Sequence, residues 1–176
     1  ADNKPEFGGR IQFPVKNGEL ALTVHSRKAK SNSGNYRENR MAIDGRIDVL
    51  AGLWFETVIQ ESKNDNIPYP WQKFLTVGSD ITIPIGNGIY FLAEHLIMAA
   101  SKNWNDSQQK ANTSAIMFSY PLSIFDTIQA MQYYSWEFEG FYQYYNWQRT
   151  FDNFIFNLNV FHYPSTTGLT NTLPIS

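Results

Sequence analysis

Apolar and polar residues alternate with a period of two over most of this chain. Between positions 41 and 59 the odd positions are mostly apolar and the even ones mostly polar, and three later segments repeat the pattern. Successive side chains of a strand point to opposite faces, so four independent segments of this kind predict an all-β, antiparallel fold. The apolar sets are Met41, Ile43, Ile47, Val49, Ala51, Leu53, Phe55 and Ile59; Leu75, Val77, Ile81 and Ile83; Ile128, Ala130, Tyr134 and Trp136; and Phe154, Phe156, Leu158 and Val160.

Turn signals divide the chain into nine predicted strands. Asn17-Gly18 and Gly86-Asn87-Gly88 indicate tight hairpins, and polar stretches at 29–38, 62–70 and 102–111 indicate longer loops. The longest predicted strand leaves room for a hidden turn near Ala51-Gly52, which would give one strand more. The predicted strands are 9–15, 19–28, 39–61, 71–85, 88–101, 112–121, 127–137, 141–150 and 154–163.

One of these segments, 88–101, is ambiguous. Its apolar residues also have helical spacing. Its place directly after a hairpin signal and its content of Ile, Tyr and Phe favour a strand, and a helix stays the alternative. The residues with helical spacing are Ile89, Leu92, Ala93, Leu96, Ile97 and Ala100.

Composition excludes several classes of protein. The length of 176 residues fits a single domain over 1–176, and a net charge of −2 removes the electrostatic case for a nucleic-acid partner. The absence of cysteine excludes disulfides, thiol catalysis and Cys-ligated metals. No run reaches the roughly 18–20 apolar residues of a spanning helix, which excludes an α-helical membrane protein.

The kinds of polar and aromatic residue change the picture further. The polar positions of the strands hold Asp, Arg, Asn, Gln, Thr and Ser, whereas the lysines are expected in loops, at Lys28, Lys30, Lys63, Lys73, Lys102 and Lys110. Aromatic residues make up 16% of the chain, and many stand near predicted strand ends, as rings at a membrane–water interface do. The residues that would form such an aromatic girdle are Trp71, Trp104, Tyr134, Trp136, Tyr145 and Trp147.

Over residues 9–163 the chain resembles bacterial outer-membrane β-barrel proteins of the porin-like kind. The resemblance is carried by the alternation, and by the stretches Ala42-Ile43-Asp44-Gly45-Arg46-Ile47-Asp48 and Phe118-Ser119-Tyr120-Pro121-Leu122. It implies an up-and-down transmembrane barrel in a Gram-negative outer membrane, apolar outside and polar inside. The partners would be membrane lipid and small polar solutes, with no cofactor.

Two departures from that family suggest a segment of a larger barrel. Bacterial barrels have an even number of strands, whereas nine are predicted here. They usually close on a strand that ends in Phe or Trp, whereas this chain ends Leu173-Pro174-Ile175-Ser176. A second copy or a partner chain would then complete the barrel.

Five charged residues are the predicted pore lining. Asp44, Arg46 and Asp48 share one face of a strand, and Glu56 and Asp80 are expected to join them. A charged lining sets the ion preference of a pore, and four acids against one arginine favour cations mildly. The alternative is a paired network that fills a plugged lumen.

We expect no enzyme and no metal site. The three histidines, His25, His95 and His162, are scattered, and neither G-x-S-x-G nor HExxH nor an acidic calcium loop is present. Two soluble alternatives stay open. One is a β-sandwich or jelly-roll carbohydrate-binding module, and the other is a lipocalin-like carrier. The first would use the densest aromatic cluster, which contains Tyr133, Tyr134, Tyr142, Tyr144, Tyr145 and Trp147.

Overall fold

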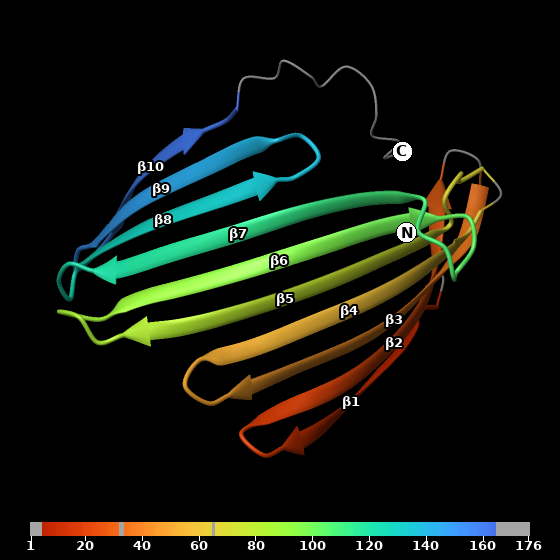
Figure 1. The fold of residues 1–176 in the computed structure, drawn as a ribbon, viewed down its shortest axis with the longest axis horizontal. Coiled ribbons are helices and arrows are strands. Elements are labelled where there is room, and N and C mark those ends of the chain that lie inside the picture. Colours follow the sequence, from red (N-terminus) through yellow and green to blue (C-terminus); the bar gives the residue numbers. More distant parts are fainter. Residues whose placement is uncertain (1–4, 32–33, 65, 165–176) are drawn as a thin grey trace.

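The described chain forms one antiparallel sheet of ten strands. The computed structural model describes residues 5–31, 34–64 and 66–164, and these contain no helix that could cross a membrane. Every strand pairs with its neighbours in sequence, so the spatial order is β1 to β10 without a crossover (Figure 1). The strands are β1 (Phe7–Val15), β2 (Gly18–Ser31), β3 (Gly34–Asp48), β4 (Gly52–Lys63), β5 (Trp71–Ile83), β6 (Ile89–Ser101), β7 (Gln109–Pro121), β8 (Asp126–Ser135), β9 (Gly140–Thr150) and β10 (Ile155–His162).

The alternation predicted most of these strands, and the ambiguous segment is a strand. Residues 88–101 form β6, which pairs along its length with β5 and β7. The long segment 39–61 contains the hidden turn, because β3 ends at Asp48 and β4 begins at Gly52. The count of nine was therefore one too low, and the sheet has an even number of strands.

The predicted loop at 29–38 is wrong. β2 continues to Ser31 and β3 begins at Gly34, with Lys28 paired to Arg37 and Ala29 paired to Tyr36. Polar composition indicated a loop here, but two strand ends whose backbones pair with each other tolerate polar side chains. The placement of the lysines in loops is also wrong for most of them, because Lys28, Lys30, Lys63, Lys73 and Lys110 stand in strands. Lys102 lies in the β6–β7 connection, as expected.

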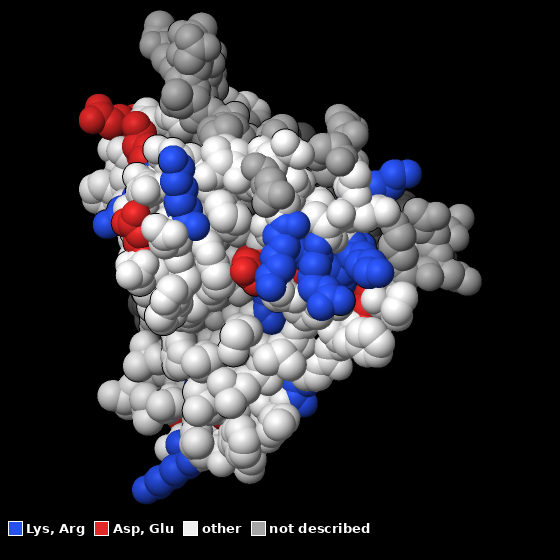
Figure 2. All heavy atoms as spheres, turned by 90° about the vertical axis from the view of Figure 1, so that its right-hand side faces the viewer, with Lys and Arg blue, Asp and Glu red and all other residues white. Residues whose placement is uncertain are grey.

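The two ends of the sheet differ in their connections. One end, here called the turn end, carries the β1–β2, β3–β4, β5–β6, β7–β8 and β9–β10 connections, at the left in Figure 1. Two of its turns need a left-handed backbone, which Asn17 (φ 60°) and Gly86 (φ 59°) adopt. The opposite end, here called the loop end, carries the longer connections 64–70 and 102–108 and gathers Lys and Arg side chains (Figure 2).

The two faces of the sheet are chemically distinct. Residues that pair directly across strands share a face, and the pairing places Ile11, Leu22 and Ile43 in one row. We call this the apolar face. The opposite side, the polar face, has rows such as Asp44 paired with Glu56. The apolar face is strongly exposed, and Ala21 is the sole buried hydrophobic residue in the described part of the chain.

The predicted closed barrel is not what the sheet forms. Among the described residues β1 pairs only with β2, and β10 pairs only with β9. These two strands are opposite edges of a curved and twisted sheet (Figure 1). The curvature of the ten strands does not bring the edges together, so no described strand pairs with the outer edge of β1 or of β10.

Candidate functional site

The five residues predicted to line a pore do share one face. β3 contributes Asp44, Arg46 and Asp48, and β4 contributes Glu56 directly opposite Asp44. Asp80 of β5 stands opposite Gly52, which itself stands opposite Asp48. Alternation fixes which side of a strand each residue faces, and the hairpin register brings the three strands into line. The site is therefore a patch on the polar face, near the turn end.

Arg46 links two carboxylates across a strand. Its Nε lies 3.0 Å from Asp48 Oδ1, and its Nη1 lies 3.2 Å from Asp80 Oδ2. A Cβ at Gly52 would lie 2.5 Å from Arg46 Nη2 and 2.7 Å from Asp80 Oδ1. The missing side chain of Gly52 therefore leaves the room in which the guanidinium crosses β4.

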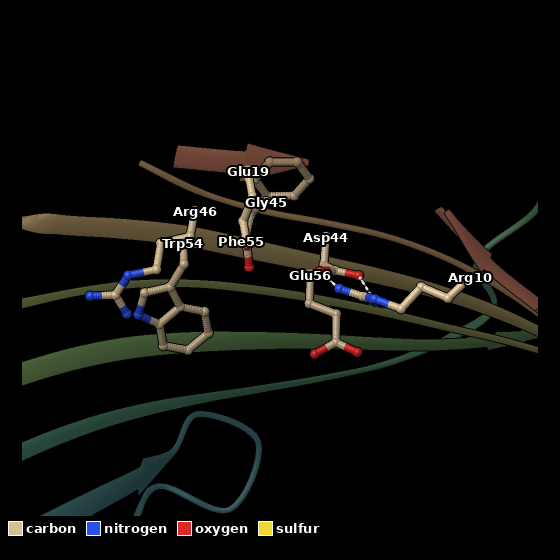
Figure 3. A pocket seen from close by; sticks show the side chains of 8 residues that line it. All are labelled: Arg10, Glu19, Asp44, Gly45, Arg46, Trp54, Phe55 and Glu56. Atoms are coloured by element: carbon tan, nitrogen blue, oxygen red, sulfur yellow. Dashed lines mark hydrogen bonds and ion pairs between the residues drawn. The ribbon is translucent and has the colours of Figure 1, made fainter. Parts of the chain in front are cut away.

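Arg10 belongs to the same patch and was missed from the sequence. Its Nη1 and Nη2 donate to Asp44 Oδ1 and Oδ2 at 2.6 and 2.7 Å, a bidentate pair that reaches from β1 over β2 to β3 (Figure 3). Nη1 also donates to Thr23 Oγ1 at 3.1 Å. The available signal was the position of Arg10 between apolar neighbours at an even place in β1.

An open depression of about 290 Å³ lies among these side chains. Figure 3 shows Arg10, Asp44 and Glu56 beside one another, with Arg46 and Trp54 next to them. Within the described residues the carboxylate of Glu56 has no ion-pair partner. The depression therefore keeps a carboxylate available to a mobile cation.

A second ion-pair cluster lies on the polar face toward the loop end. Glu38 is 4% exposed, and its Oε1 lies 2.9 Å from Arg27 Nε and 2.8 Å from Arg40 Nη2. Gln60 Nε2 donates to the other oxygen of Glu38 at 3.2 Å. The sequence analysis missed this cluster because part of it fell in the stretch assigned to a loop.

The polar face changes character over β9 and β10. Asn159 Oδ1 accepts hydrogen bonds from Tyr144 Oη at 2.9 Å and from Asn146 Nδ2 at 2.7 Å. Asn146 Nδ2 also lies 3.4 Å from Asn157 Oδ1. In the described part of β6–β10, no ion pair occurs on this face. Amide and hydroxyl groups thus satisfy one another here without any charge.

The dense aromatic cluster is divided between the two faces. Pairing puts Tyr133, Tyr142 and Tyr144 on the polar face and Tyr134, Tyr145 and Trp147 on the apolar face. A single stacking platform for a sugar, as the carbohydrate-binding alternative required, is not assembled. The described strands also form one sheet, without the second layer of a sandwich.

The predicted girdle is mostly on the apolar face. Trp71 and Tyr134 lie there near the loop end, and Trp136 packs edge-on against Tyr134 with ring centroids 5.0 Å apart. Trp104 stands in the β6–β7 connection and is 63% exposed. Trp147 is near the turn end, whereas Tyr145 falls in the middle of β9, away from either level.

One histidine meets a serine on the apolar face. His95 Nδ1 lies 2.9 Å from Ser114 Oγ, which also accepts a hydrogen bond from Trp136 Nε1 at 3.0 Å. No described side chain bonds to the other ring nitrogen of His95, so the third member of a catalytic triad is not in place. The contact satisfies three polar groups on an apolar surface, and the expectation of no enzyme activity stays a prediction.

No protein-family model, no curated protein and no solved structure matches this chain. The structure establishes an all-β, antiparallel, up-and-down sheet. The function proposed below rests on the chemistry of its two faces.

Proposed function

We propose that this chain forms part of a porin-like β-barrel in a Gram-negative outer membrane, through which small polar solutes pass without covalent chemistry. The apolar face would contact lipid and the polar face would line an aqueous lumen. One observation carries the proposal: large apolar side chains are exposed on one face of the sheet, while charged side chains gather and pair on the opposite face. Examples of exposed apolar residues are Ile43 (45%), Leu53 (50%) and Val160 (53%).

The free energy gained by burying apolar side chains favours contact between the apolar face and a nonaqueous phase. Burying one large apolar side chain contributes about 1.5–3 kcal/mol, and this sheet leaves such side chains exposed on strand after strand. Membrane hydrocarbon would cover them without a second protein layer. The ion pairs around Arg46 and Glu38 lie on the other side, where water reaches them.

The open edges support completion by further strands. Within hydrocarbon every backbone N–H and C=O must be paired, so a sheet can span a membrane only as a closed barrel. The outer edges of β1 and β10 would pair with strands of a second copy or of a partner chain. The even number of strands fits this arrangement, because both edges then accept antiparallel neighbours.

The charges on the polar face favour a mild cation preference. Five carboxylates stand on this patch, those of Glu19, Asp44, Asp48, Glu56 and Asp80, against the guanidiniums of Arg10 and Arg46. Arg10 and Glu19 add one charge of each sign, so the negative excess is the same as among the five residues predicted from the sequence. A structural barrel without conduction is the alternative that bilayer recording separates.

Cysteine labelling tests the assignment of faces. The chain has no native cysteine, so single variants can be made at neighbouring positions on opposite faces. In lipid vesicles, a membrane-impermeant thiol reagent should label Asp44→Cys and Glu56→Cys and spare Ile43→Cys and Phe55→Cys. All four should react after denaturation. Equal labelling in vesicles, or labelling of positions 43 and 55 alone, would contradict the proposal.

A matched pair of threonines tests the same point through stability. Thr57 lies on the apolar face in the middle of β4, and Thr76 lies on the polar face opposite Glu56. Thr57→Arg should lower the free energy of unfolding from vesicles by about 2–4 kcal/mol, the cost of an arginine near the bilayer midplane. Thr76→Arg should cost far less. A protein that remains monomeric in buffer without detergent would rule out the membrane assignment.

A further inference from the structure

Three cations stand directly opposite one another at the loop end. Lys28 of β2 pairs with Arg37 of β3, and Arg37 pairs with Lys63 of β4. All three side chains are exposed on the apolar side of the sheet, and Figure 2 shows Lys and Arg gathered on this end. Directly paired residues have Cβ atoms about 5 Å apart, and like charges in such positions destabilise a sheet. This cationic row therefore carries an unfavourable energy that a bound anion would relieve.

Carboxylates among the described residues do not neutralise the row. Glu61 Oε2 is 3.7 Å from Lys63 Nζ and also accepts a hydrogen bond from Asn39. Glu38 lies on the opposite face, where Arg27 and Arg40 hold it. Among the described residues, Lys28 and Arg37 have no ion-pair partner. Three cations therefore stand beside a single described carboxylate, that of Glu61, which also bonds to Asn39.

The row ends a gradient that runs along the apolar face of β2, β3 and β4. Four successive rows are Leu22–Ile43–Thr57, Val24–Met41–Ile59, Ser26–Asn39–Glu61 and Lys28–Arg37–Lys63. Successive rows are about 7 Å apart, so the cations stand about 14 Å beyond the last apolar row. Apolar, then polar, then cationic side chains follow the order of hydrocarbon, interface and headgroup in a membrane leaflet.

The turn end has no equivalent row. Its apolar-face rows end in residues such as Ile47 and Leu53, and its turns carry Leu50 (96% exposed) and Ile124 (91% exposed). The cation on this face of β9, Arg149, lies 3.4 Å from Asp126 Oδ1. The charge on the lipid-facing side is therefore asymmetric between the two ends.

We propose that the cationic row Lys28, Arg37 and Lys63 binds the phosphate of an anionic lipid headgroup, and that this places the loop end in the leaflet richer in such lipids. The inference rests on the proposed membrane function, because it requires the apolar rows to lie in hydrocarbon. A guanidinium can hold two phosphate oxygens at once, and the flanking ammonium groups add point charges on either side. Carboxylates of the polar face, such as Glu38, cannot neutralise the row, because they lie on the other side of the sheet.

Lipid binding to the full chain in vesicles tests the proposal. Vesicles of pure phosphatidylcholine would be compared with vesicles that also contain phosphatidylglycerol, and the lipid retained by the extracted protein would be analysed. The triple variant K28Q/R37Q/K63Q should lose the preference for phosphatidylglycerol by about fivefold for each cation removed at low salt. The control K16Q removes one cation at the opposite, turn end of the sheet and should retain the preference, whereas K28Q alone should lower it about fivefold.

The outcomes separate this inference from the proposed function. Insertion into both kinds of vesicle without any preference for phosphatidylglycerol overturns the headgroup site alone. Failure to insert into either overturns the membrane function, and the headgroup site with it. Inorganic phosphate should not displace the bound lipid. If phosphate alone protects Lys28 and Lys63 from an amine-modifying reagent as well as the lipid does, the row is a site for free anions instead.

Discussion

The polar face is built in two different ways along the same sheet. Over β1–β5, the charged half, guanidiniums and carboxylates pair, as Arg46 does with Asp80. Over β6–β10, here called the amide half, the side-chain bonds on this face join Asn and Tyr residues of β9 and β10, as Asn146 does with Asn159. Backbone pairing is continuous through both halves. The backbone pairing of the sheet therefore does not dictate which chemistry satisfies the polar face.

The two halves differ in how far their polar side chains extend across the sheet. Neighbouring strands are about 4.8 Å apart, and an arginine is long enough to cross an intervening strand, whereas an asparagine is not. Arg10 reaches over β2 to Asp44, and Arg46 reaches over β4 to Asp80. The intervening strands offer small residues at these points, Ala21 opposite Asp44 and Gly52 opposite Asp80. The charged half is therefore tied together across three strands at a time, and the amide half across two.

The largest effect is expected in the charged half, at Glu38. Glu38→Leu leaves the guanidiniums of Arg27 and Arg40 without their shared carboxylate. Because both guanidiniums are partly exposed, water offsets some of the loss, and we expect the free energy of unfolding to fall by about 2–3 kcal/mol. Urea titration of the protein in vesicles measures it.

Asp48→Leu is the matched control for that variant. Asp48 also pairs with Arg46, but its side chain is 60% exposed, and exposed ion pairs contribute little to stability. The loss should be much smaller than for Glu38→Leu. Equal losses would mean that burial does not distinguish the two clusters.

A smaller effect is expected in the amide half, at Asn146. Asn146→Leu removes the donor to Asn157 and Asn159 from a side chain that is only 9% exposed. Asn159 keeps its bond from Tyr144, so we expect a loss of about 1–2 kcal/mol in the same titration. Gln148→Leu, at a neighbouring position with no side-chain bond among the described residues, should change stability less. A larger loss at Gln148 would contradict the amide network.

The smallest effect concerns ion selectivity and compares the halves directly. Glu56→Gln should lower the cation-to-anion permeability ratio, and Gln129→Glu, which adds a carboxylate to the amide half, should raise it. A unit charge acts with about 1 kcal/mol at 4 Å in water, which limits each change to about fivefold. Reversal potentials in planar bilayers measure both, and both should shrink as salt rises. A ratio that neither variant changes would mean that the polar face does not line the conducting path.

The alternation of residues predicted the faces of the sheet well. The alternation of even and odd positions alone placed Asp44, Arg46 and Asp48 on one face. It also predicted the face of Glu56 correctly across the turn, because β3 and β4 pair even-numbered residues with even-numbered ones, as Asp44 with Glu56. The same rule separates Tyr144 from Tyr145, so the division of the aromatic cluster was within reach of the sequence.

The remaining features depend on contacts between strands distant in sequence. The pair of Arg10 with Asp44 requires the register of two successive hairpins, which parity does not specify. The polar composition of the ends of β2 and β3 predicted a loop there, so Glu38 was not recognised as a strand residue. Backbone pairing stabilises these strand ends although their side chains do not alternate between apolar and polar. The open edges follow from the overall curvature, which no local pattern encodes.

The sequential order of the strands has a consequence for how such a sheet can change size. Every described strand pairs only with its immediate neighbours in the chain, so the hairpins β1–β2 and β9–β10 are each joined to the rest of the sheet through one pair of strands. A duplicated or deleted hairpin at β1–β2 or β9–β10 would leave the register of the other strands unchanged. It would alter only the number of strands in the sheet. Duplication or loss of an edge hairpin, two strands at a time, is therefore the simplest route by which an architecture of this kind becomes wider or narrower.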